Sequence, residues 1–458
     1  MIENKRNPKT PGARELALRI LSDAEARDRH VEDLLAAALK GHPDLPRSER
    51  GFLLELVQGV KRWQLRLDYT LSRLSRLPWR KVHPQVRQIL RLAAYQILFL
   101  DKVPVHAAVD EAAKLAHARR LPASHVGFIN AILRRLARGE APPLPKMEDD
   151  PVAALAAATA HPAWLVERWL ARYGHEETES LLSANNQVPA LTVRVNTLRT
   201  DPPSLRERLG CEGVKASPCR YSPVGLVFES VDQPPTSLPS FREGLWLFQD
   251  EAAQLTTCLL PVTAGQHLLE IGAGRGGKTT HLGEAIRNQG LVWAVDYHEQ
   301  RLRSLHQNLK RWGVTCAQPL RADATRPLPV KPGSLDAVLI DAPCSALGII
   351  RRHPEIKTRL QQVDLSTFPP RQRQMLEGVA PLLKAGGRIL YITCTTEPEE
   401  NEDLIAGFLK DHPEYHLTFE PDLLPRPTRE FFQTPGFFRT SPARPGLDGF
   451  FAALLVRG

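Results

Sequence analysis

The amino-acid sequence predicts a multidomain protein: an all-α bundle, then a small α+β module, then an α/β domain with a mostly parallel sheet. Apolar residues recur at helical spacing through residues 12–138, and short apolar segments alternate with helical ones from about residue 244. Proline-rich stretches at 141–151 and 233–240 separate these regions. We therefore expect domains at residues 1–140, 152–240 and 241–458.

The composition is that of an ordinary globular protein, and it excludes several classes. Of the 458 residues, 42% are hydrophobic and 24% are charged. No stretch reaches the roughly 18 consecutive apolar residues of a membrane-spanning helix, and the polar N-terminus lacks the apolar core of a secretory signal. The six cysteines form no C-x-x-C pair, so neither a metal site nor a disulfide framework is expected. We expect a cytoplasmic monomer without a bound metal.

The N-terminal region predicts a helical bundle with a basic exterior. Prolines at positions 46, 78, 84, 104 and 122 stand between its apolar runs, where a fixed φ favours helix starts. Residues 1–140 hold 26 Lys and Arg against 15 Asp and Glu, whereas residues 141–458 hold 34 against 36. A basic excess concentrated in one domain is typical of a polyanion partner such as nucleic acid. A merely solvated surface remains open on charge alone.

The middle region mixes helix and strand, and the last region alternates them. Between the prolines, helices are expected at 162–173 and 204–209, with a strand at 191–195. Further strands are expected at 267–271, 291–295, 318–322, 336–340, 388–393, 416–419 and 450–456, and helices at 277–287, 299–312, 371–383 and 400–411. This alternation predicts a parallel, doubly wound sheet, in which ligands bind at the carboxyl ends of the strands.

A glycine-rich turn follows the first strand of this sheet and opens a helix. It consists of Gly272, Ala273, Gly274, Arg275, Gly276, Gly277 and Lys278. Glycines at this place let the backbone approach a nucleotide-like ligand closely. The letters also match a phosphate-binding P-loop, with a threonine after the lysine. The choice of ligand therefore depends on the residues at the neighbouring strand ends.

Three aspartates end the next three strands. Asp296 can accept hydrogen bonds from ribose hydroxyls, Asp323 can accept one from an adenine amino group, and Asp341 ends the fourth strand. Carboxylates around the site would repel a triphosphate, so we favour an adenosine that carries no phosphates, and S-adenosylmethionine is such a ligand. A nicotinamide dinucleotide remains an alternative for Asp296, and each aspartate could instead cap a helix.

Two cysteines, Cys344 and Cys394, follow the fourth and fifth strands, so both are expected to face the ligand. A thiolate that adds to C6 of cytosine makes C5 nucleophilic enough to accept a methyl group from a sulfonium. Lys278, or Arg351 and Arg352, would favour the thiolate. A protonated Asp341 could then donate to N3 of the base. The other cysteines are interpreted as small buried hydrophobes: Cys211, Cys219, Cys258 and Cys316.

At this point the chain resembles the bacterial 16S ribosomal RNA cytosine-C5 methyltransferases that carry a NusB-like N-terminal domain, and the resemblance runs through the whole length. The run DAPCSALGIIRRHP (341–354) is highly specific to this group, whereas the glycine turn is not. Further matching segments are VGFINAILRR (126–135), HPAWLVERW (161–169), LTVRVNT (191–197), QDEAAQL (249–255), GRGGKTTH (274–281), DYHEQRL (296–302), YITCTTEPEEN (391–401) and DGFFAALL (448–455).

The resemblance implies a Rossmann-like methyltransferase domain that methylates C5 of one cytosine of 16S ribosomal RNA, cytosine 967 in the conventional numbering. It implies that Cys394 attacks C6, and that Cys344 assists proton removal or product release. S-adenosylmethionine would be held by the turn at 272–278 together with Asp296, Arg301, Asp323 and Asp341. The family's turn usually reads C-A-A-P-G-G-K, so this chain exchanges a rigid proline for a flexible glycine loop with an added cation.

The bundle would position RNA through its phosphates, and the target base would lie unpaired or be extruded into the site. Arg351, Arg352 and His353 are expected to line its entrance, although a solvated charge cluster is equally compatible with the sequence. Two alternatives remain for the function. One is the same chemistry on transfer RNA, and the other is an RNA-binding assembly factor that keeps the fold without turnover.

Overall fold

The computed structural model describes residues 11–27, 30–443 and 446–458, and the chain forms two units. The helical unit comprises residues 1–186 and 353–359, and the sheet unit comprises residues 187–352 and 360–458. Residues 1–10, which include most of the polar N-terminus noted above, lie outside the described part of the chain. No helix within the described ranges is long and apolar enough to cross a membrane.

Prolines start several helices of the helical unit, as the sequence predicts. Pro46, Pro104 and Pro122 directly precede α3, α5 and α6, and Pro84 is the first residue of α4. At these positions a fixed φ suits the helix and the missing N–H costs nothing. The helices are α1 (Ala13–Arg27), α2 (Val31–Gly41), α3 (Arg47–Leu74), α4 (Pro84–Phe99), α5 (Val105–Ala118), α6 (Ala123–Ala137), α7 (Pro151–Thr159), α8 (Ala163–Ala184) and the short α14 (Ile356–Arg359).

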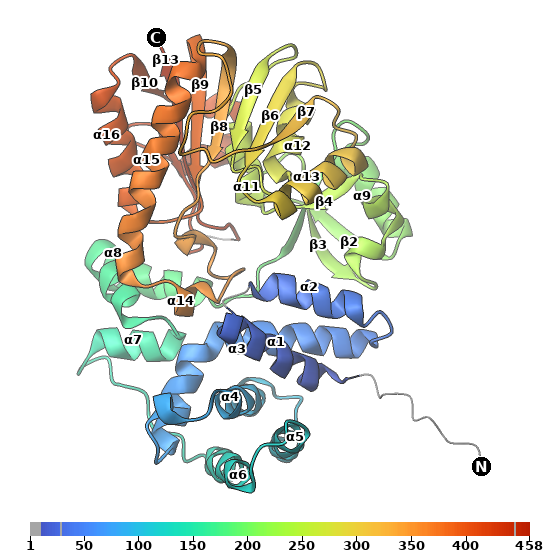
Figure 1. Ribbon diagram of the computed structural model, residues 1–458, viewed down its shortest axis with the longest axis vertical. Helices are drawn as coiled ribbons and strands as arrows, with labels where there is room; N and C mark the ends of the chain where they lie inside the picture. Colours follow the sequence, from blue (N-terminus) through green and yellow to red (C-terminus); the bar gives the residue numbers. More distant parts are fainter. Residues whose placement is uncertain (1–10, 28–29, 444–445) are drawn as a thin grey trace. The chain divides into compact units, whose positions relative to one another are not determined.

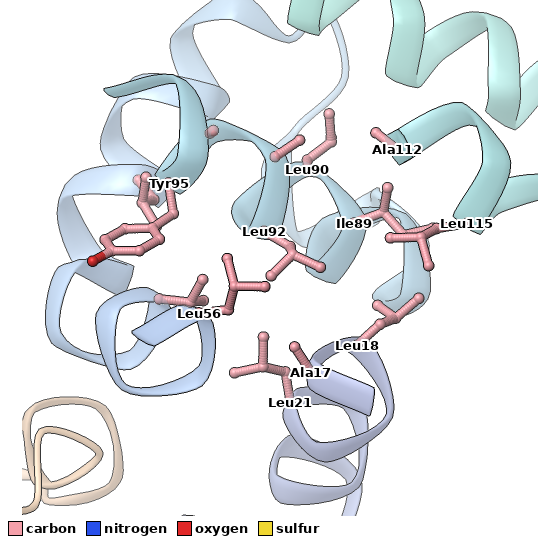
Figure 2. Packing of buried hydrophobic residues seen from close by; sticks show 14 of the residues in the cluster. Ala17, Leu18, Leu21, Leu56, Ile89, Leu90, Leu92, Tyr95, Ala112 and Leu115 are labelled. Atoms are coloured by element: carbon pink, nitrogen blue, oxygen red, sulfur yellow. The ribbon is translucent and has the colours of Figure 1, made fainter. Parts of the chain in front are cut away.

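The core of this unit forms where α1, α3, α4 and α5 turn their apolar faces toward one another (Figure 2). Leu21, Leu56 and Leu92 come from three of these helices and are all buried. A Cβ at Gly59 of α3 would stand 2.0 Å from the ring of Tyr95 in α4, so glycine is needed for this close helix approach. The helical spacing of the apolar residues thus becomes one packed core.

Helix α8 is longer than the helix predicted at 162–173. The chain kinks at Gly174 (φ 75°, ψ −178°) and continues to Ala184 rather than ending. Both α7 and α8 belong to the helical unit, although the sequence pattern placed residues 152–240 in one separate module. Proline and polar composition marked the linker at 141–151, but composition does not reveal which neighbour a helix packs against.

A small antiparallel sheet opens the sheet unit. Its strands are β1 (Leu191–Val195), β2 (Val214–Pro218), β3 (Gly225–Val231) and β4 (Trp246–Phe248), in the order β2-β3-β1-β4. Helix α9 (Pro202–Cys211) contributes Leu205 and Leu209 to the core of this sheet, and the short α10 (Pro239–Arg242) follows buried Leu238. The proline-rich stretch 233–240 is therefore part of the packed module, and the expected boundary after residue 240 falls inside it.

The large sheet has the order β11-β12-β13-β9-β8-β5-β6-β7, with β10 paired to β13. Strands β9, β8, β5, β6 and β7 are parallel, whereas β13 runs antiparallel to β9. The mostly parallel sheet is as predicted. The strands are β5 (His267–Ile271), β6 (Leu291–Asp296), β7 (Ala317–Arg321), β8 (Leu335–Asp341), β9 (Leu383–Thr393), β10 (Tyr415–Thr418), β11 (Phe432–Gln433), β12 (Phe437–Arg439) and β13 (Phe451–Arg457).

Helices cover both faces of this sheet (Figure 1). On one face, Leu268 and Leu339 belong to the same core as residues of α11 (Glu251–Cys258), α12 (Gly277–Ala285) and α13 (Glu299–Trp312). On the other face, Leu269 and Val338 belong to the same core as residues of α15 (Phe368–Val379) and α16 (Glu402–Asp411). Because both faces are buried, the central strands are continuous apolar runs. The carboxyl ends of the five parallel strands, β5, β6, β7, β8 and β9, remain available to form a site.

Candidate active site

A cleft of about 640 Å³ lies at the carboxyl ends of the parallel strands. This volume is within the range of small-molecule sites. The predicted residues that line it are Gly272, Gly274, Asp296, Arg301, Asp323, Asp341, Cys344 and Cys394. Residues from five strand ends, far apart in the sequence, are therefore brought together as the parallel topology requires.

The glycine turn adopts a backbone conformation that residues with a Cβ rarely adopt. Gly272, Gly274 and Gly276 all have positive φ, at 80°, 56° and 92°. A Cβ at Gly272 would stand 2.3 Å from the carbonyl oxygen of Asp341, so the turn lies directly against the end of β8. Asp296 fixes it from the next strand, because its Oδ2 accepts a hydrogen bond from the Gly274 N–H at 2.9 Å.

The remainder of the predicted turn does not line the cleft. Ala273, Arg275, Gly276 and Gly277 are not among the cleft-lining residues; Gly276 precedes α12, and the Arg275 carbonyl accepts a hydrogen bond from Asn308. The other oxygen of Asp296 is also engaged, since Oδ1 accepts from the His298 N–H at 2.7 Å. These residues shape the loop, and the direct ligand surface at this end is formed by Gly272 and Gly274.

Lys278 acts on the site through Asp341. Its Nζ donates to Asp341 Oδ2 at 2.6 Å, and its side chain is 9% exposed. Burial disfavours the ammonium, but the negative charges of Asp341 and Glu270 outweigh it, so the pKa of Lys278 is raised. The negative charge of a Cys394 thiolate acts on the pKa of Lys278 in the same direction. The expectation that Lys278 favours a thiolate stays a prediction.

The two cysteines are in direct contact. Sγ of Cys344 lies 3.3 Å from Sγ of Cys394. The hydrogen bond to Cys394 raises the pKa of Cys344 well above its ordinary value, and withdrawal from water and the negative charge of Cys394 act in the same direction. Cys344 therefore remains a protonated thiol that can donate to Cys394. A protonated Cys344 thiol therefore lies against the sulfur of Cys394 before any substrate binds.

The residues that follow the two cysteines form a hydrogen-bond network that fixes their positions. Ser345 Oγ and Thr395 Oγ1 are 2.6 Å apart, and Glu400 accepts from both the N–H and the hydroxyl of Ser345 at 3.0 and 2.5 Å. Gln372 of α15 donates to Glu400 and to the carbonyl of Pro343, at 3.0 Å in each case. Burial raises the pKa of Glu400, although these hydrogen bonds oppose it. The sequence analysis did not identify this network.

Other residues of the cleft were also missed. Tyr297, His298, Pro343, Arg371 and Met375 line it. Tyr297 and His298 directly follow Asp296, so their place at a strand end was a usable signal. Arg371 and Met375 lie on α15, and no spacing rule indicated that this helix reaches the cleft.

The arginines expected at the entrance have a different role. Arg351 and Arg352 are absent from the cleft lining; both donate to Asp448 at 2.5 Å, and Arg352 also donates to Asp250 at 2.6 Å. Asp448 is 1% exposed, so this is a buried ion cluster that anchors the loop after Cys344. His353 belongs to the helical unit. The interpretation of these residues as an entrance was wrong for both arginines, because their acidic partners are distant in sequence.

The remaining cysteines lie outside the cleft lining. Cys316 is buried, and Cys219 and Cys258 are partly buried, but Cys211 is exposed. The interpretation as buried hydrophobes was therefore wrong for Cys211. Burial raises the pKa of Cys258 to about 11, which leaves it protonated at neutral pH.

Comparisons with known proteins agree with this site. The model of the 16S rRNA methyltransferase RsmB/F family matches residues 257–456, the NusB family matches residues 11–138, and the RsmF/B-like ferredoxin-like domain matches residues 161–232. The crystal structure of PH0851 is 27% identical with a TM-score of 0.84, and the comparison covers 97% of this chain and 99% of that one. A methyltransferase homolog protein from Pyrococcus horikoshii is 25% identical with a TM-score of 0.58, over 68% and 99% of the two chains.

Curated relatives are similar along almost the whole chain. The probable ribosomal RNA small subunit methyltransferase B of Synechocystis sp. is 35% identical, over 97% of this chain and 99% of its own length. The corresponding protein of Bacillus subtilis is 33% identical, over 97% and 98%. The chain therefore belongs to the family of ribosomal RNA small subunit methyltransferases B, which use S-adenosylmethionine as the methyl donor.

Proposed function

We propose that the protein methylates C5 of a cytosine in 16S ribosomal RNA, cytosine 967 in conventional numbering, through a covalent bond between Cys394 and C6. The observation that carries the proposal is the contact between Cys344 and Cys394 at the ends of two neighbouring strands of the donor cleft. A methyltransferase that acts on a nucleophilic nitrogen or oxygen has no need of a thiol pair, whereas carbon C5 has to be activated first.

The cleft fits the methyl donor on its own features. Asp296 and Asp323 offer carboxylates at adjacent strand ends, and Val295 and Met375 offer apolar contact between them. The hydrogen bonds that Asp323 accepts from Thr325 lower the pKa of its carboxyl, which keeps it an acceptor for ribose or adenine. When bound, S-adenosylmethionine supplies an electrophilic methyl group on sulfur. We assign its binding to Gly272, Gly274 and these side chains, with Arg301 at the rim.

The residues of the chain then perform the remaining steps. The Cys394 thiolate forms a bond to C6, and the electron pair of the C5–C6 double bond moves to C5, which takes the methyl group. The C5 proton passes to solvent water, the C5–C6 double bond forms again, and the Cys394–C6 bond breaks to return the thiolate. Cys344 is the neighbouring thiol that can donate to Cys394 as the thiolate leaves.

Asp341 is the member of the Lys278–Asp341 pair that faces the cleft. Lys278 Nζ donates to Asp341 Oδ2 at 2.6 Å and so fixes the orientation of the carboxyl group. As a carboxylate, Asp341 accepts a hydrogen bond from the amino group of cytosine. As an acid, it would instead donate to N3, as the sequence analysis expected.

Two cysteine variants test the proposal. Cys394→Ala should abolish methylation of a 16S ribosomal RNA fragment, whereas Cys344→Ala should accumulate a covalent protein–RNA species on a denaturing gel. Cys211→Ala, which changes an exposed cysteine, is the matched control and should behave as wild type. Full turnover by Cys394→Ala would refute the covalent mechanism. An adduct seen in Cys394→Ala rather than in Cys344→Ala would exchange the two roles.

The target and the enzymatic character need separate measurements. Bisulfite sequencing of small-subunit RNA from a strain without the gene should show loss of one modified cytosine. Methylation of transfer RNA in place of the ribosomal fragment would favour the transfer RNA alternative. Calorimetric titration with S-adenosylmethionine addresses the remaining alternative, because an assembly factor without turnover would show no donor binding.

A further inference from the structure

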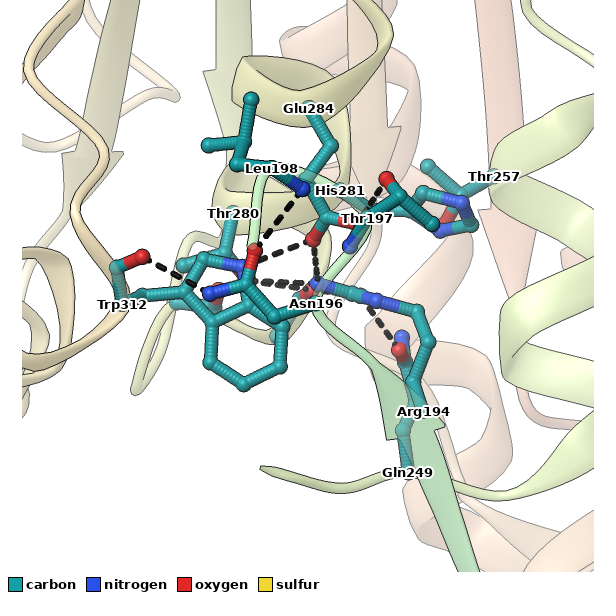
Figure 3. Close-up of polar contacts among 12 residues, drawn as sticks. Arg194, Asn196, Thr197, Leu198, Gln249, Thr257, Thr280, His281, Glu284 and Trp312 are labelled. Carbon is teal, nitrogen blue, oxygen red and sulfur yellow. Dashed lines mark hydrogen bonds and ion pairs between the residues drawn. The ribbon is translucent and has the colours of Figure 1, made fainter. Parts of the chain in front are cut away.

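A buried arginine of the small sheet reaches the first turn of the donor-loop helix (Figure 3). Arg194 lies in β1 and is 0% exposed. Its Nη1 donates to the carbonyl of Gly277 at 2.5 Å, and its Nη2 donates to Thr280 Oγ1 at 2.7 Å. Gly277 and Thr280 form the start of α12, directly after the glycine turn that lines the cleft. A residue outside the methyltransferase fold proper therefore holds the helix that begins at the donor.

Glu284, one to two turns further along α12, completes this contact. It accepts from Arg194 Nη2 at 2.7 Å, and its side chain is 2% exposed. It also accepts from Trp312 Nε1 at 2.7 Å and from the N–H and hydroxyl of Thr197, at 3.1 and 2.7 Å. The charge of Arg194 is thus paired and the carboxylate is saturated with donors, as a buried ion pair requires.

Other contacts of the segment 194–197 also connect the small sheet to helices of the large one. Asn196 donates to the carbonyls of Gly244 and Trp312 at 2.7 and 2.8 Å, and its Oδ1 accepts from the Leu198 N–H. The Arg194 guanidinium also lies over the ring of Trp312, with 5.3 Å between its Cζ and the ring centroid. The segment 194–197 therefore contacts the start of α12 and the end of α13. Planar stacking and a rigid fork of five donors are properties of arginine that lysine lacks.

The position of this contact points to a role at the donor site. Helix α12 carries Lys278 between Gly277 and Thr280, and Lys278 holds Asp341 of the cleft. Thr280 Oγ1 also donates to the carbonyl of Gly276 at 2.8 Å. A shift of the first turn would therefore move both the glycine turn and the Lys278–Asp341 pair. We propose that Arg194 is a positioning residue for the donor site, through which the small sheet sets the conformation of the glycine turn.

The inference rests on the proposed function only in that the cleft binds the methyl donor. Arg194 touches neither Cys344 nor Cys394, so its loss should weaken donor binding and spare the covalent chemistry. Arg194→Lys should raise the Kd for S-adenosylmethionine about tenfold, as is typical of coupled sites. The KM for the donor should rise similarly, while kcat at saturating donor stays within about twofold of wild type.

Two further variants make the test decisive. Thr280→Val leaves the Arg194–Glu284 ion pair and the hydrogen bond to the Gly277 carbonyl intact. It removes the hydrogen bonds that connect Arg194 through Thr280 to the Gly276 carbonyl, so it should also raise the Kd, and it decides the matter if Arg194→Lys fails to fold by circular dichroism. Arg208→Lys is the control, because Arg208 pairs with Glu212 and Glu243 on the surface of the same small module, and its Kd should equal that of wild type.

The outcomes separate the two proposals. Folded Arg194→Lys and Thr280→Val proteins with wild-type Kd and KM would overturn the positioning role and leave Arg194 as a structural contact between two modules. A fall in kcat at saturating donor without a change in Kd would also overturn it. Failure of the wild-type protein itself to bind the donor would instead refute the proposed function.

Discussion

Replacing Glu270 with glutamine should stabilise the sheet unit at alkaline pH and change it little in acid. Glu270 lies in β5, two residues before the first glycine of the turn, and is 1% exposed. Burial raises its pKa from an ordinary 4.5 to about 7, because the hydrogen bond from Thr279 and the charge of Lys278 offset only part of the cost. The pKa of this carboxyl is higher in the folded state than in the unfolded state. At any pH at which the unfolded chain has released the proton, this difference lowers the free energy of unfolding.

The sign and the magnitude follow from the two pKa values. Below pH 4.5 both states bind the proton, and stability is unaffected. Between pH 4.5 and 7 the unfolded chain releases the proton while the folded chain retains it, so stability falls as the pH rises and levels off above 7. At about 1.4 kcal/mol for each pH unit, the total cost amounts to about 3 kcal/mol at pH 8.5 and less than about 1 kcal/mol at pH 5.

Calorimetric unfolding at pH 5 and pH 8.5 measures this difference. A gain of about 3 kcal/mol corresponds to a rise in Tm of roughly 6–12 °C for a unit of this size. Glu270→Gln should show that rise at pH 8.5 and only a small one at pH 5. Glu207→Gln, an exposed change in α9, is the matched control and should show neither. Equal Tm values for wild type and Glu270→Gln at pH 8.5 would refute the reasoning that folding bears the cost of an ionised, buried Glu270.

Three other outcomes are expected. Gly272→Ala should prevent donor binding in calorimetry, because its Cβ would meet the Asp341 carbonyl at 2.3 Å in a backbone with φ of 80°; wild-type affinity would contradict this geometry. Glu400→Ala removes the acceptor of three hydrogen bonds behind the cysteine pair and should lower kcat about 10- to 100-fold, whereas Glu400→Gln should retain most of it. Arg351→Met leaves Asp448 short of a buried partner and should cost about 3–5 kcal/mol in denaturant unfolding; a loss below 1 kcal/mol would mean that the cluster adds little.

The positions of several cleft residues could be predicted from the sequence. Cys344 and Cys394 are 50 residues apart, but each follows a strand, and parallel strands bring their carboxyl ends to one edge. The same argument correctly predicted that Asp296, Asp323 and Asp341 line one cleft. These predictions hold because strand position and side-chain period are local properties of the chain.

Contacts between segments that are far apart in the sequence could not be predicted from the sequence. Arg351 and Arg352 were expected at an entrance because they follow the Cys344 loop. Nothing near them in the sequence indicated their partner Asp448, which lies almost 100 residues away. The role of Arg194 could not be predicted from the sequence. An arginine within an apolar strand does not indicate which residue it contacts, and Glu284 lies 90 residues later. Lys278 was expected to touch the donor, yet it holds Asp341. The sequence gives the charge of a side chain, but it does not show whether that charge faces water, a ligand or a partner residue.

The sequence by itself determined the family, the alternation of strands and helices, and the residues with reactive groups, because these depend on composition and local spacing. The tertiary structure alone decided that Cys344 and Cys394 meet, and which strand contacts the helix after the glycine turn. It also decided which helices join the N-terminal bundle. These properties arise from contacts between residues distant in the sequence, such as the 3.3 Å between the two sulfurs and the 2.7 Å between Arg194 and Glu284. At such distances burial strengthens hydrogen bonds and charge interactions.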